Sequence, residues 1–448
     1  MSLDADAAEL QAAWSDFVAG LNRGRDALDS PELHAPPPSE RLLAEGYRYL
    51  LGFTFSAIER AFGEDPDFPY FRRAIQPMDK ATIDNADALY LTAVINGTRT
   101  YRITGEVADH AHWTGGPRAP VGPWAPQYLI VEVHSHYVGD TGSIVELAPG
   151  GRSITGTVDS TELVVTDGRF EMVVGPERPA GHEGSFLSTG TEDGADPVGT
   201  YVVVRVLYHD WENEVAPTLS ITPVSPGPLH PVPAAPDGVA ARLRRAGLIV
   251  ENQMRFWNEF YDVVCGAFGE GNPQALAPMS RNGVNTPTNA QLATGGGQST
   301  NVYAGGRFHL GSDEALLVEV STPVGPAYQG LHLSNLWGES FDYANHVTSL
   351  NGFQAVPDPD GVCRYVVSHR DPGVPNWLDT TGHDEGLLAF RWTYPSPPDQ
   401  MPTVVAAKVR VVELAGLLPA GVPLVSPSER EAQIRVRQAH VQRRYRQY

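Results

Sequence analysis

The chain has 448 residues, with 53 acidic and 32 basic side chains and a formal net charge of −21. Charge of this sign repels nucleic acid and anionic membrane surfaces, so neither is expected as a partner. The 38 prolines and 45 glycines, with only 19% charged residues, favour strands joined by turns over a helical bundle.

Two amphipathic helices are expected in the N-terminal segment, residues 1–84. The first has apolar residues at spacings of four, three and four, which form one face: Leu10, Trp14, Phe17 and Leu21. Ser39 is the expected cap of the second helix, which ends at Gly63. Its apolar side is expected to face the body of the protein through Leu43, Tyr47, Leu50, Ile58 and Phe62.

A first β region is expected over residues 85–225. Strands 89–95 and 98–104 flank Asn96-Gly97, a dipeptide that tolerates the positive φ angles of a two-residue hairpin. Further strands are expected at Tyr128–His136, Gly168–Val174, Tyr201–Tyr208 and Thr218–Val224. The proline-rich stretch 223–236 is typical of a linker.

Residues 226–300 are expected to form a long linking helix and then a loop. The helix is expected to start at a cap, Asp237, and to stop at Gly269. Its periodic apolar residues are Val239, Leu243, Val250, Met254, Trp257, Tyr261, Val264 and Phe268. The Asn-, Thr- and Gly-rich stretch 271–300 has the length of a functional or mobile loop, but its glycine run lacks the Lys-Ser/Thr ending of a phosphate-binding loop.

A second β region is expected over residues 301–415, and a basic helix over residues 416–448. Pro427 and a capping box from Ser428 to Glu431 open this helix. It carries Arg430, Arg435, Arg437, Arg443, Arg444 and Arg446. We expect it to dock on an acidic surface of its own chain or of a neighbouring subunit; the alternative is packing through Ile434, Val441 and Tyr445, with solvated arginines.

The two β regions share five matches in the same order, which predicts an internal duplication. The matched segments are 129–133 with 316–320, 167–174 with 360–367, 185–189 with 376–380, 203–206 with 389–392, and 217–218 with 402–403. The predicted fold is therefore β-dominated with helical additions: two duplicated antiparallel β-sandwich (jelly-roll-like) domains, an N-terminal helical pair, a long linking helix and a C-terminal basic helix. Two repeated ion pairs are expected between strands, Glu132 with Arg205 and Glu319 with Arg391.

A polar set present in only one copy is the first candidate for a site. Asn376, Asp379 and His383 lie within eight positions on one loop, where a rigid β scaffold can present chemistry. Asp379 could orient His383 for general acid/base catalysis. The alternative is a polar loop whose Asn and Asp side chains cap their own turn. Trp377 and Arg391 are the candidate substrate-binding residues, with Arg391 facing an anionic group.

His134 and His136 form a second candidate. They stand at i and i+2 on one strand, so both imidazoles point to the same face and could bind one metal, as in cupin-like barrels. The alternative is a pair of surface imidazoles on a half-exposed strand. We expect neither a cofactor nor a resident metal, with this pair as the exception to test.

The run 369–379, together with Gly382-His383 and the strand containing Arg391-Trp392, resembles the C-terminal part of bacterial proteins of the domain of unknown function 1214 family. Residues 84–90 and 208–211 are also similar to that group. The resemblance is specific over about the last third of the chain and looser over the N-terminal half. It implies a β-sandwich fold and a bacterial setting, and it implies no agreed activity.

Two functions from different classes follow. The leading hypothesis is an enzyme that acts by acid/base chemistry on a small hydroxylated or glycosidic metabolite in a pocket by the second β region. The alternative is a non-catalytic ligand-binding or assembly protein, and a second alternative is a cupin-like metal-dependent enzyme that uses His134 and His136. Cys265 and Cys363 form no CxxC pair, the N-terminus has no leader pattern and no apolar run reaches membrane-spanning length, so a soluble cytoplasmic protein in a reducing compartment is expected. A small-molecule ligand and a homo-oligomer formed through the C-terminal helix are the expected partners.

Overall fold

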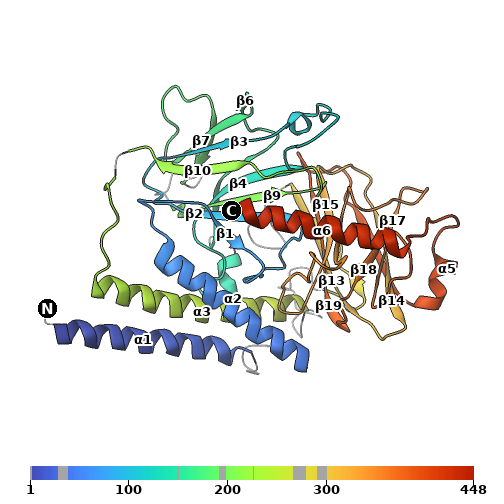
Figure 1. Cartoon of the computed structure of the whole chain (residues 1–448), viewed down its shortest axis with the longest axis horizontal. Helices are drawn as coiled ribbons and strands as arrows, with labels where there is room; N and C mark the ends of the chain where they lie inside the picture. Colours follow the sequence, from blue (N-terminus) through green and yellow to red (C-terminus); the bar gives the residue numbers. More distant parts are fainter. Residues whose placement is uncertain are drawn as a thin grey trace.

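The computed structural model describes residues 3–28, 39–148, 151–190, 198–225, 227–265, 279–289 and 300–447. Its strands form four mainly antiparallel sheets, two in each half of the chain, with helices around them (Figure 1). The expectation of a β-dominated fold with helical additions is confirmed.

The first half of the chain contains two sheets that share one hydrophobic core. One sheet has the order β1 (Arg72–Ile75), β2 (Ala88–Val94), β9 (Tyr201–Leu207), β4 (Tyr128–His134) and β5 (Ile154–Asp159). The other has the order β10 (Thr218–Pro223), β3 (Tyr101–Glu106), β7 (Arg169–Gly175) and β6 (Val165–Thr166), with β8 (Ser185–Ser188) parallel to β7. Apolar side chains alternate inward along these strands because successive residues point to opposite faces.

The second half also contains two sheets around one core. The first has the order β11 (Gly283–Val284), β13 (Asn301–His309), β19 (Glu385–Thr393), β15 (Tyr328–Ser334) and β16 (Ser349–Asn351), with β12 (Thr288–Asn289) on β13. The second has the order β18 (Trp377–Asp379), β17 (Cys363–Ser368), β14 (Glu314–Ser321) and β20 (Thr403–Arg410). Strand β18 runs parallel to β17, as β8 does to β7.

Three long helices pack together beside the sheets: α1 (Leu3–Asp26), α2 (Glu40–Gly63) and α3 (Pro236–Cys265). Helices α1 and α3 meet at glycines, since a Cβ atom on Gly20 would lie 2.6 Å from the carbonyl oxygen of Gly247. Short helical turns occur at η2 (Ala111–Thr114), η3 (Ile144–Leu147), η4 (Val411–Glu413) and α5 (Leu414–Leu417). None of the helices in the described part of the chain has an apolar stretch long enough to span a bilayer.

The expected orientation of α2 is wrong. Of the five residues predicted to face the body, only Leu50 is buried. The buried side instead contains small residues beside aromatic ones: Gly46, Tyr49, Leu50, Gly52, Phe53, Ser56, Ala57, Arg60 and Ala61. The helix is apolar on both sides, and Gly46 and Gly52 on the buried side allow a close approach to Trp337 and to the loop around Met78.

Two expectations about strand pairing are also wrong. The Asn96-Gly97 turn does not form a hairpin, because β2 pairs with β1 and β9 whereas β3 pairs with β10 and β7. The predicted repeat match of 129–133 with 316–320 is wrong as well. The first segment lies on β4, which pairs with β9, but the second lies on β14, which pairs with β17 and β20 and not with β19, the counterpart of β9. Glu319 therefore cannot reach Arg391, and its carboxylate lies 2.8 Å from Arg364.

The C-terminal helix α6 (Pro427–Gln447) lies across both β regions (Figure 1). Its capping box is formed by Ser426 and Glu429, two residues earlier than predicted. Three arginines spaced by seven residues, Arg430, Arg437 and Arg444, are buried. Arg430 pairs with Asp371, but Arg437 and Arg444 donate to backbone carbonyl groups, so the helix docks on its own chain mainly through carbonyl oxygens rather than an acidic surface.

The linking helix begins at Pro236, so Asp237 lies in its first turn instead of capping it. The expected end, at Phe268 and Gly269, lies outside the described residues. So does most of the loop predicted over 271–300, of which the structure describes only 279–289 and residue 300.

Candidate ligand site between the two β regions

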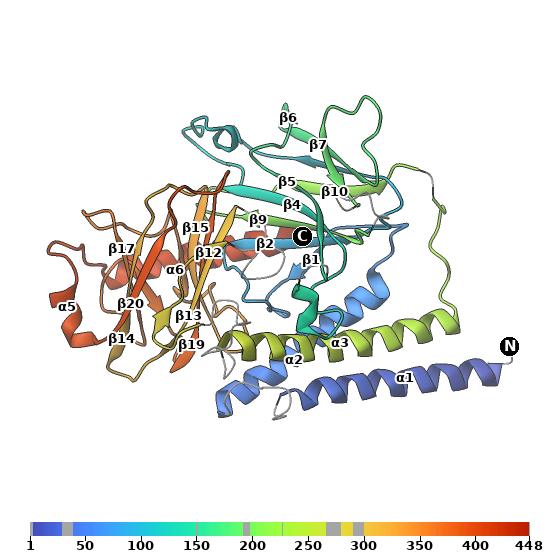
Figure 2. The ribbon, with the colours of Figure 1, turned by 180° about the vertical axis from the view of Figure 1, so that it is seen from behind.

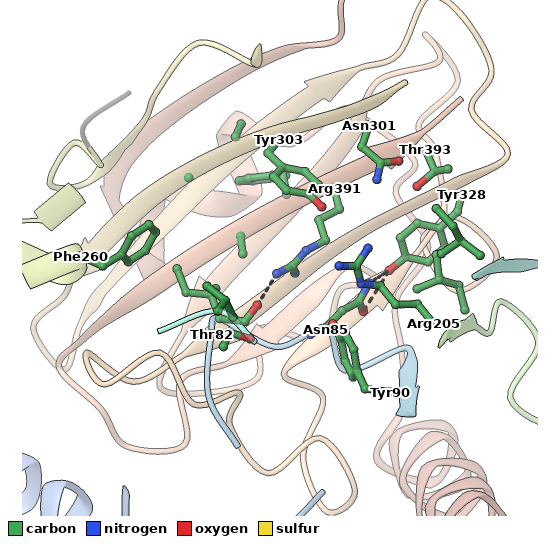
Figure 3. A pocket seen from close by; sticks show the side chains of 18 of the residues that line it. Thr82, Asn85, Tyr90, Arg205, Phe260, Asn301, Tyr303, Tyr328, Arg391 and Thr393 are labelled. Atoms are coloured by element: carbon green, nitrogen blue, oxygen red, sulfur yellow. Dashed lines mark hydrogen bonds between the residues drawn. The ribbon is translucent and has the colours of Figure 1, made fainter. Parts of the chain in front are cut away.

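A cavity of about 250 Å³ lies between the sheet of β2, β9 and β4 and the sheet of β13, β19 and β15, and α3 closes one end of it (Figure 3). The polar and aromatic residues among its lining are Thr82, Asn85, Tyr90, Tyr128, Arg152, Arg205, Trp257, Phe260, Asn285, Asn301, Tyr303, Tyr328, Phe390, Arg391 and Thr393. The two β regions therefore contribute to a single site.

Each of the two sheets presents an arginine from its central strand. Arg205 on β9 is paired in register with Tyr90, and Arg391 on β19 is paired in register with Tyr303. Their neighbours along the strands point into the hydrophobic cores, so strand alternation directs both guanidinium groups into the cavity. Figure 3 shows both side chains among the residues that line the cavity.

Arg205 is held by a buried polar chain. Its Nη1 atom lies 2.7 Å from Oε2 of Glu132, and the same carboxylate oxygen lies 3.1 Å from Nε2 of His134. Nδ1 of His134 faces the guanidinium group of Arg152, which also lines the cavity. Burial by itself would raise the pKa of Glu132, but Arg205, His134 and Arg152 outweigh burial and lower this pKa to about 2.

The protonation state of His134 follows from the same electrostatics. Burial, reinforced by the positive charge of Arg152, lowers the pKa of His134 to about 4, so the imidazole is neutral at pH 7. A neutral imidazole can donate from Nε2 to Glu132 and accept at Nδ1 from Arg152. This group of hydrogen-bonded side chains thus contains one carboxylate, Glu132, and two arginines, so the group has a net positive charge.

Unlike Arg205, Arg391 has no carboxylate partner among the described residues. Its Nη2 donates to the carbonyl oxygen of Ile83, while its buried Nη1 finds no hydrogen-bond partner among the described residues. The described part of the chain gives Arg391 no ion pair. A buried donor without a partner costs about 1–3 kcal/mol, which an incoming acceptor would recover.

The loop that accepts from Arg391 has an unusual backbone. Thr82 and Ile83 have φ angles of 67° and 52°, in a region that β-branched residues rarely adopt. Ile83 is fixed there by donating its backbone N–H to the carbonyl oxygen of Gly338 at 2.9 Å. Backbone strain of this kind costs of order 1–3 kcal/mol per residue and is frequent at ligand sites.

Tyr328, in the polar part of the cavity, is fixed by hydrogen bonds to buried polar residues. The hydroxyl group of Tyr328 donates to Asp87 at 2.8 Å and accepts from Nδ2 of Asn85 at 2.9 Å. Burial, with the adjacent charge of Asp87, holds the pKa of Tyr328 well above its usual value. Tyr328 is therefore a protonated hydrogen-bonding group at pH 7 and a poor general base.

The charge of the lining is opposite to that of the protein. Three arginines face the cavity, whereas none of the described lining residues is Asp, Glu or His. In a chain with 21 more acidic than basic residues, such a lining creates a local positive potential. The apolar part of the lining lies toward α3, where it contains Trp257, Phe260 and Met279.

The polar loop predicted from the sequence lies elsewhere. None of Asn376, Trp377, Asp379 and His383 lines this cavity, whereas Arg391 does. Asn376 is buried, and its side-chain amide donates to and accepts from the backbone of Val356, as in a structural Asn. Trp377 is also buried, and its indole N–H donates to Ser368.

Asp379 and His383 do not form the expected pair. Oδ2 of Asp379 lies 2.7 Å from Nδ1 of His346. Nε2 of His383 lies 2.7 Å from Oε1 of Glu45 on α2, and its ring stacks on Phe341 at a centroid distance of 4.1 Å. This loop therefore ties α2 to the second β region.

The histidine pair of the first β region is likewise engaged by protein groups. Both ring nitrogens of His134 have partners, and one of them is a guanidinium group, which would repel a metal cation. Nδ1 of His136 lies 3.2 Å from the carbonyl oxygen of Tyr137. No cluster of three or more potential metal ligands occurs in the part of the chain that the structure describes.

Sequence reasoning missed most of the cavity. Arg205 was assigned to a structural ion pair, which exists, and Arg152, Tyr90, Tyr303 and Tyr328 were not considered. One signal was available: Arg205 and Arg391 each interrupt an otherwise apolar strand at matching positions of the two regions. A charge placed twice in central strands indicates a shared polar interior.

Comparison with known proteins supports the fold alone. No family profile matches the sequence, and no curated protein matches it. An uncharacterised protein from Burkholderia cenocepacia, known from a crystal structure, is similar with a TM-score of 0.73 and 24% identity over 91% of this chain and 99% of that chain. A protein from Vibrio parahaemolyticus gives a TM-score of 0.41 and 11% identity over 87% of this chain and 100% of that chain.

Proposed function

We propose that this protein binds a small organic anion in the cavity between its two β regions. The observation that supports the proposal is the lining: three arginines without a carboxylate among the described residues, in a strongly acidic protein. An excess of guanidinium groups around a partly apolar cavity is complementary to a carboxylate on an organic body.

The shape of the cavity narrows the class of ligand. Its volume of about 250 Å³ corresponds to roughly eight water molecules, so it suits a ligand smaller than a typical drug. Arg205, Arg391 and Asn301 make one part polar, while Trp257 and Phe260 make the end toward α3 apolar. An aromatic or short aliphatic monocarboxylate fits both parts.

Binding is better supported than acid/base catalysis. A general acid/base near neutral pH is most often a histidine or a carboxylate, and the described lining contains neither. The candidate trio Asn376, Asp379 and His383 is occupied by structural hydrogen bonds away from the cavity. We therefore place the ligand-binding function ahead of the enzymatic one.

Titration calorimetry with matched ligands tests the proposal. The probes are benzoate, phenylacetate and hexanoate, each compared with its neutral amide. We expect the carboxylates to bind and Arg391→Gln to weaken them by about ten- to a hundredfold, since a hydrogen bond to a charged group contributes about 1.5–3 kcal/mol. Arg435→Gln, on an exposed face of α6, is the control. Equal binding of acids and amides, or an unchanged affinity in Arg391→Gln, would overturn the proposal.

We also propose that the two β regions are duplicated antiparallel sandwiches and that the chain belongs to the domain of unknown function 1214 family. The strand orders β2-β9-β4-β5 and β13-β19-β15-β16 support the duplication, as do β10-β3-β7-β8 and β20-β14-β17-β18. The site itself supports it too, because Tyr128 opposes Leu207 two residues beyond Arg205, and Tyr328 opposes Thr393 two residues beyond Arg391. In this scheme the cavity lies between equivalent faces of the two copies.

A further inference from the structure

Helix α2 exposes a continuous apolar stripe that extends over most of its length. The stripe consists of Leu43, Tyr47, Leu51, Phe55, Ile58 and Phe62, each between 37% and 56% exposed. Figure 1 shows α2 crossing in front of α3, and from behind α3 lies in front of α2 (Figure 2). The stripe residues are not among the buried residues of α2, which form its contact with the rest of the protein.

The exposed residues in the C-terminal half of α2 are all apolar. Between residues 49 and 63, every exposed residue is apolar, while the exposed charges Glu40, Arg41 and Arg48 lie toward the N-terminal end. Single exposed hydrophobic residues are ordinary, but contiguous apolar patches of several hundred Å² mark interaction sites.

The spacing of the stripe is close to palindromic about its centre. The sums of the paired positions 43 and 62, 47 and 58, and 51 and 55 differ by at most one residue. An antiparallel copy of α2 would therefore place Tyr47 opposite Ile58 and Leu51 opposite Phe55. A two-fold interface requires such self-complementarity.

The available area suits a second copy. Six side chains exposed by about half present roughly 500 Å² per chain, or about 1,000 Å² for two chains. The flanking surface brings this toward the 1,200–2,000 Å² that stable interfaces bury. An anionic bilayer fits less well, because the protein carries a net charge of −21 and no exposed residue of α2 between positions 49 and 63 is basic.

We propose that this chain forms a two-fold homodimer in which the α2 stripes of two copies pack antiparallel. The dimer leaves the ligand cavity unchanged, since none of the six stripe residues lines it. The C-terminal helix α6, whose buried arginines are engaged within the chain, is not required for this contact.

Light scattering coupled to gel filtration of the full chain tests the dimer. We expect the wild type to have the mass of two chains and Leu51→Lys and Phe55→Lys to have half that mass, with unchanged circular dichroism because both side chains point away from the core. Val412→Lys, which alters a 77% exposed valine elsewhere, should remain dimeric.

Three outcomes would overturn the proposal. They are a wild type that is monomeric at every concentration, a dimer that persists in both lysine variants, and a monomeric wild type that co-sediments with phosphatidylcholine vesicles. The last outcome would assign the stripe to a lipid surface.

Discussion

Replacement of Glu132 by Gln removes the only negative charge in the chain of contacts that holds Arg205 and Arg152 beside the cavity. Glu132 is fully buried, and its pKa is lowered from 4.5 to about 2. Because one pKa unit corresponds to about 1.4 kcal/mol, the ionised carboxylate stabilises the folded state by about 3 kcal/mol at pH 7. Loss of one partner from a buried ion pair costs a similar amount, about 3–5 kcal/mol.

The pH dependence of this stabilisation has a definite sign. The folded pKa is depressed, so the contribution is fully present above pH 4.5 and is lost as the pH falls through about 2. We expect urea unfolding at pH 7 to show Glu132→Gln destabilised by about 3 kcal/mol, with a difference from the wild type that shrinks below pH 4.5. Glu171→Gln, which breaks an exposed pair with Arg102, should cost less than about 1 kcal/mol. Equal midpoints for the wild type and Glu132→Gln at pH 7, or a gap that does not depend on pH, would refute the reasoning.

Three further predictions concern other parts of the structure. Gly338→Ala should lower the unfolding free energy by at least about 2 kcal/mol, because Gly338 has a φ angle of 69° and a Cβ atom there would lie 1.8 Å from the hydroxyl oxygen of Tyr261; an unchanged melting temperature would contradict this. Arg437→Leu should destabilise the fold by about 1–3 kcal/mol in urea titrations, since buried carbonyl groups lose their donor, whereas Arg435→Leu on the exposed side of the same helix should have little effect. His383→Gln should reduce stability by about 1–3 kcal/mol through its lost contact with Glu45, yet leave the calorimetric affinity for benzoate unchanged; a weakened affinity would return this residue to the binding site.

Part of the candidate site could be predicted from the sequence. Arg391 is the predicted residue for an anionic group, and it lines the cavity. The Glu132–Arg205 pair, predicted from the internal repeat, is present. The partners of Asp379 and His383 were not predictable, because His346 and Glu45 lie 33 and 338 residues away in the chain. Short spacing favoured a local Asp–His pair, but tertiary packing supplied closer partners to each residue.

Local patterns determined which segments form elements. Short apolar runs between turn residues located β4, β7, β9 and β10 to within a few residues, and helical periodicity located α1, α2 and α3. The strands β5 and β8, which are short and rich in Ser, Thr and Gly, are not predicted by such runs. These patterns depend on residues that are neighbours in the chain, so the sequence alone suffices for them.

Tertiary structure decided which faces meet. Helix α2 is apolar on two sides, and only its packing on α3 shows that the side with glycine and alanine is buried while the Leu43-to-Phe62 stripe is exposed. Strand alternation likewise places Arg205 and Arg391 opposite their own cores, but it cannot bring two sheets together. The cavity exists because the sheet faces that contain Arg205 and Arg391 pack against each other. These two residues are 186 positions apart in the sequence, and contacts over such a distance depend on the whole chain rather than on a local pattern.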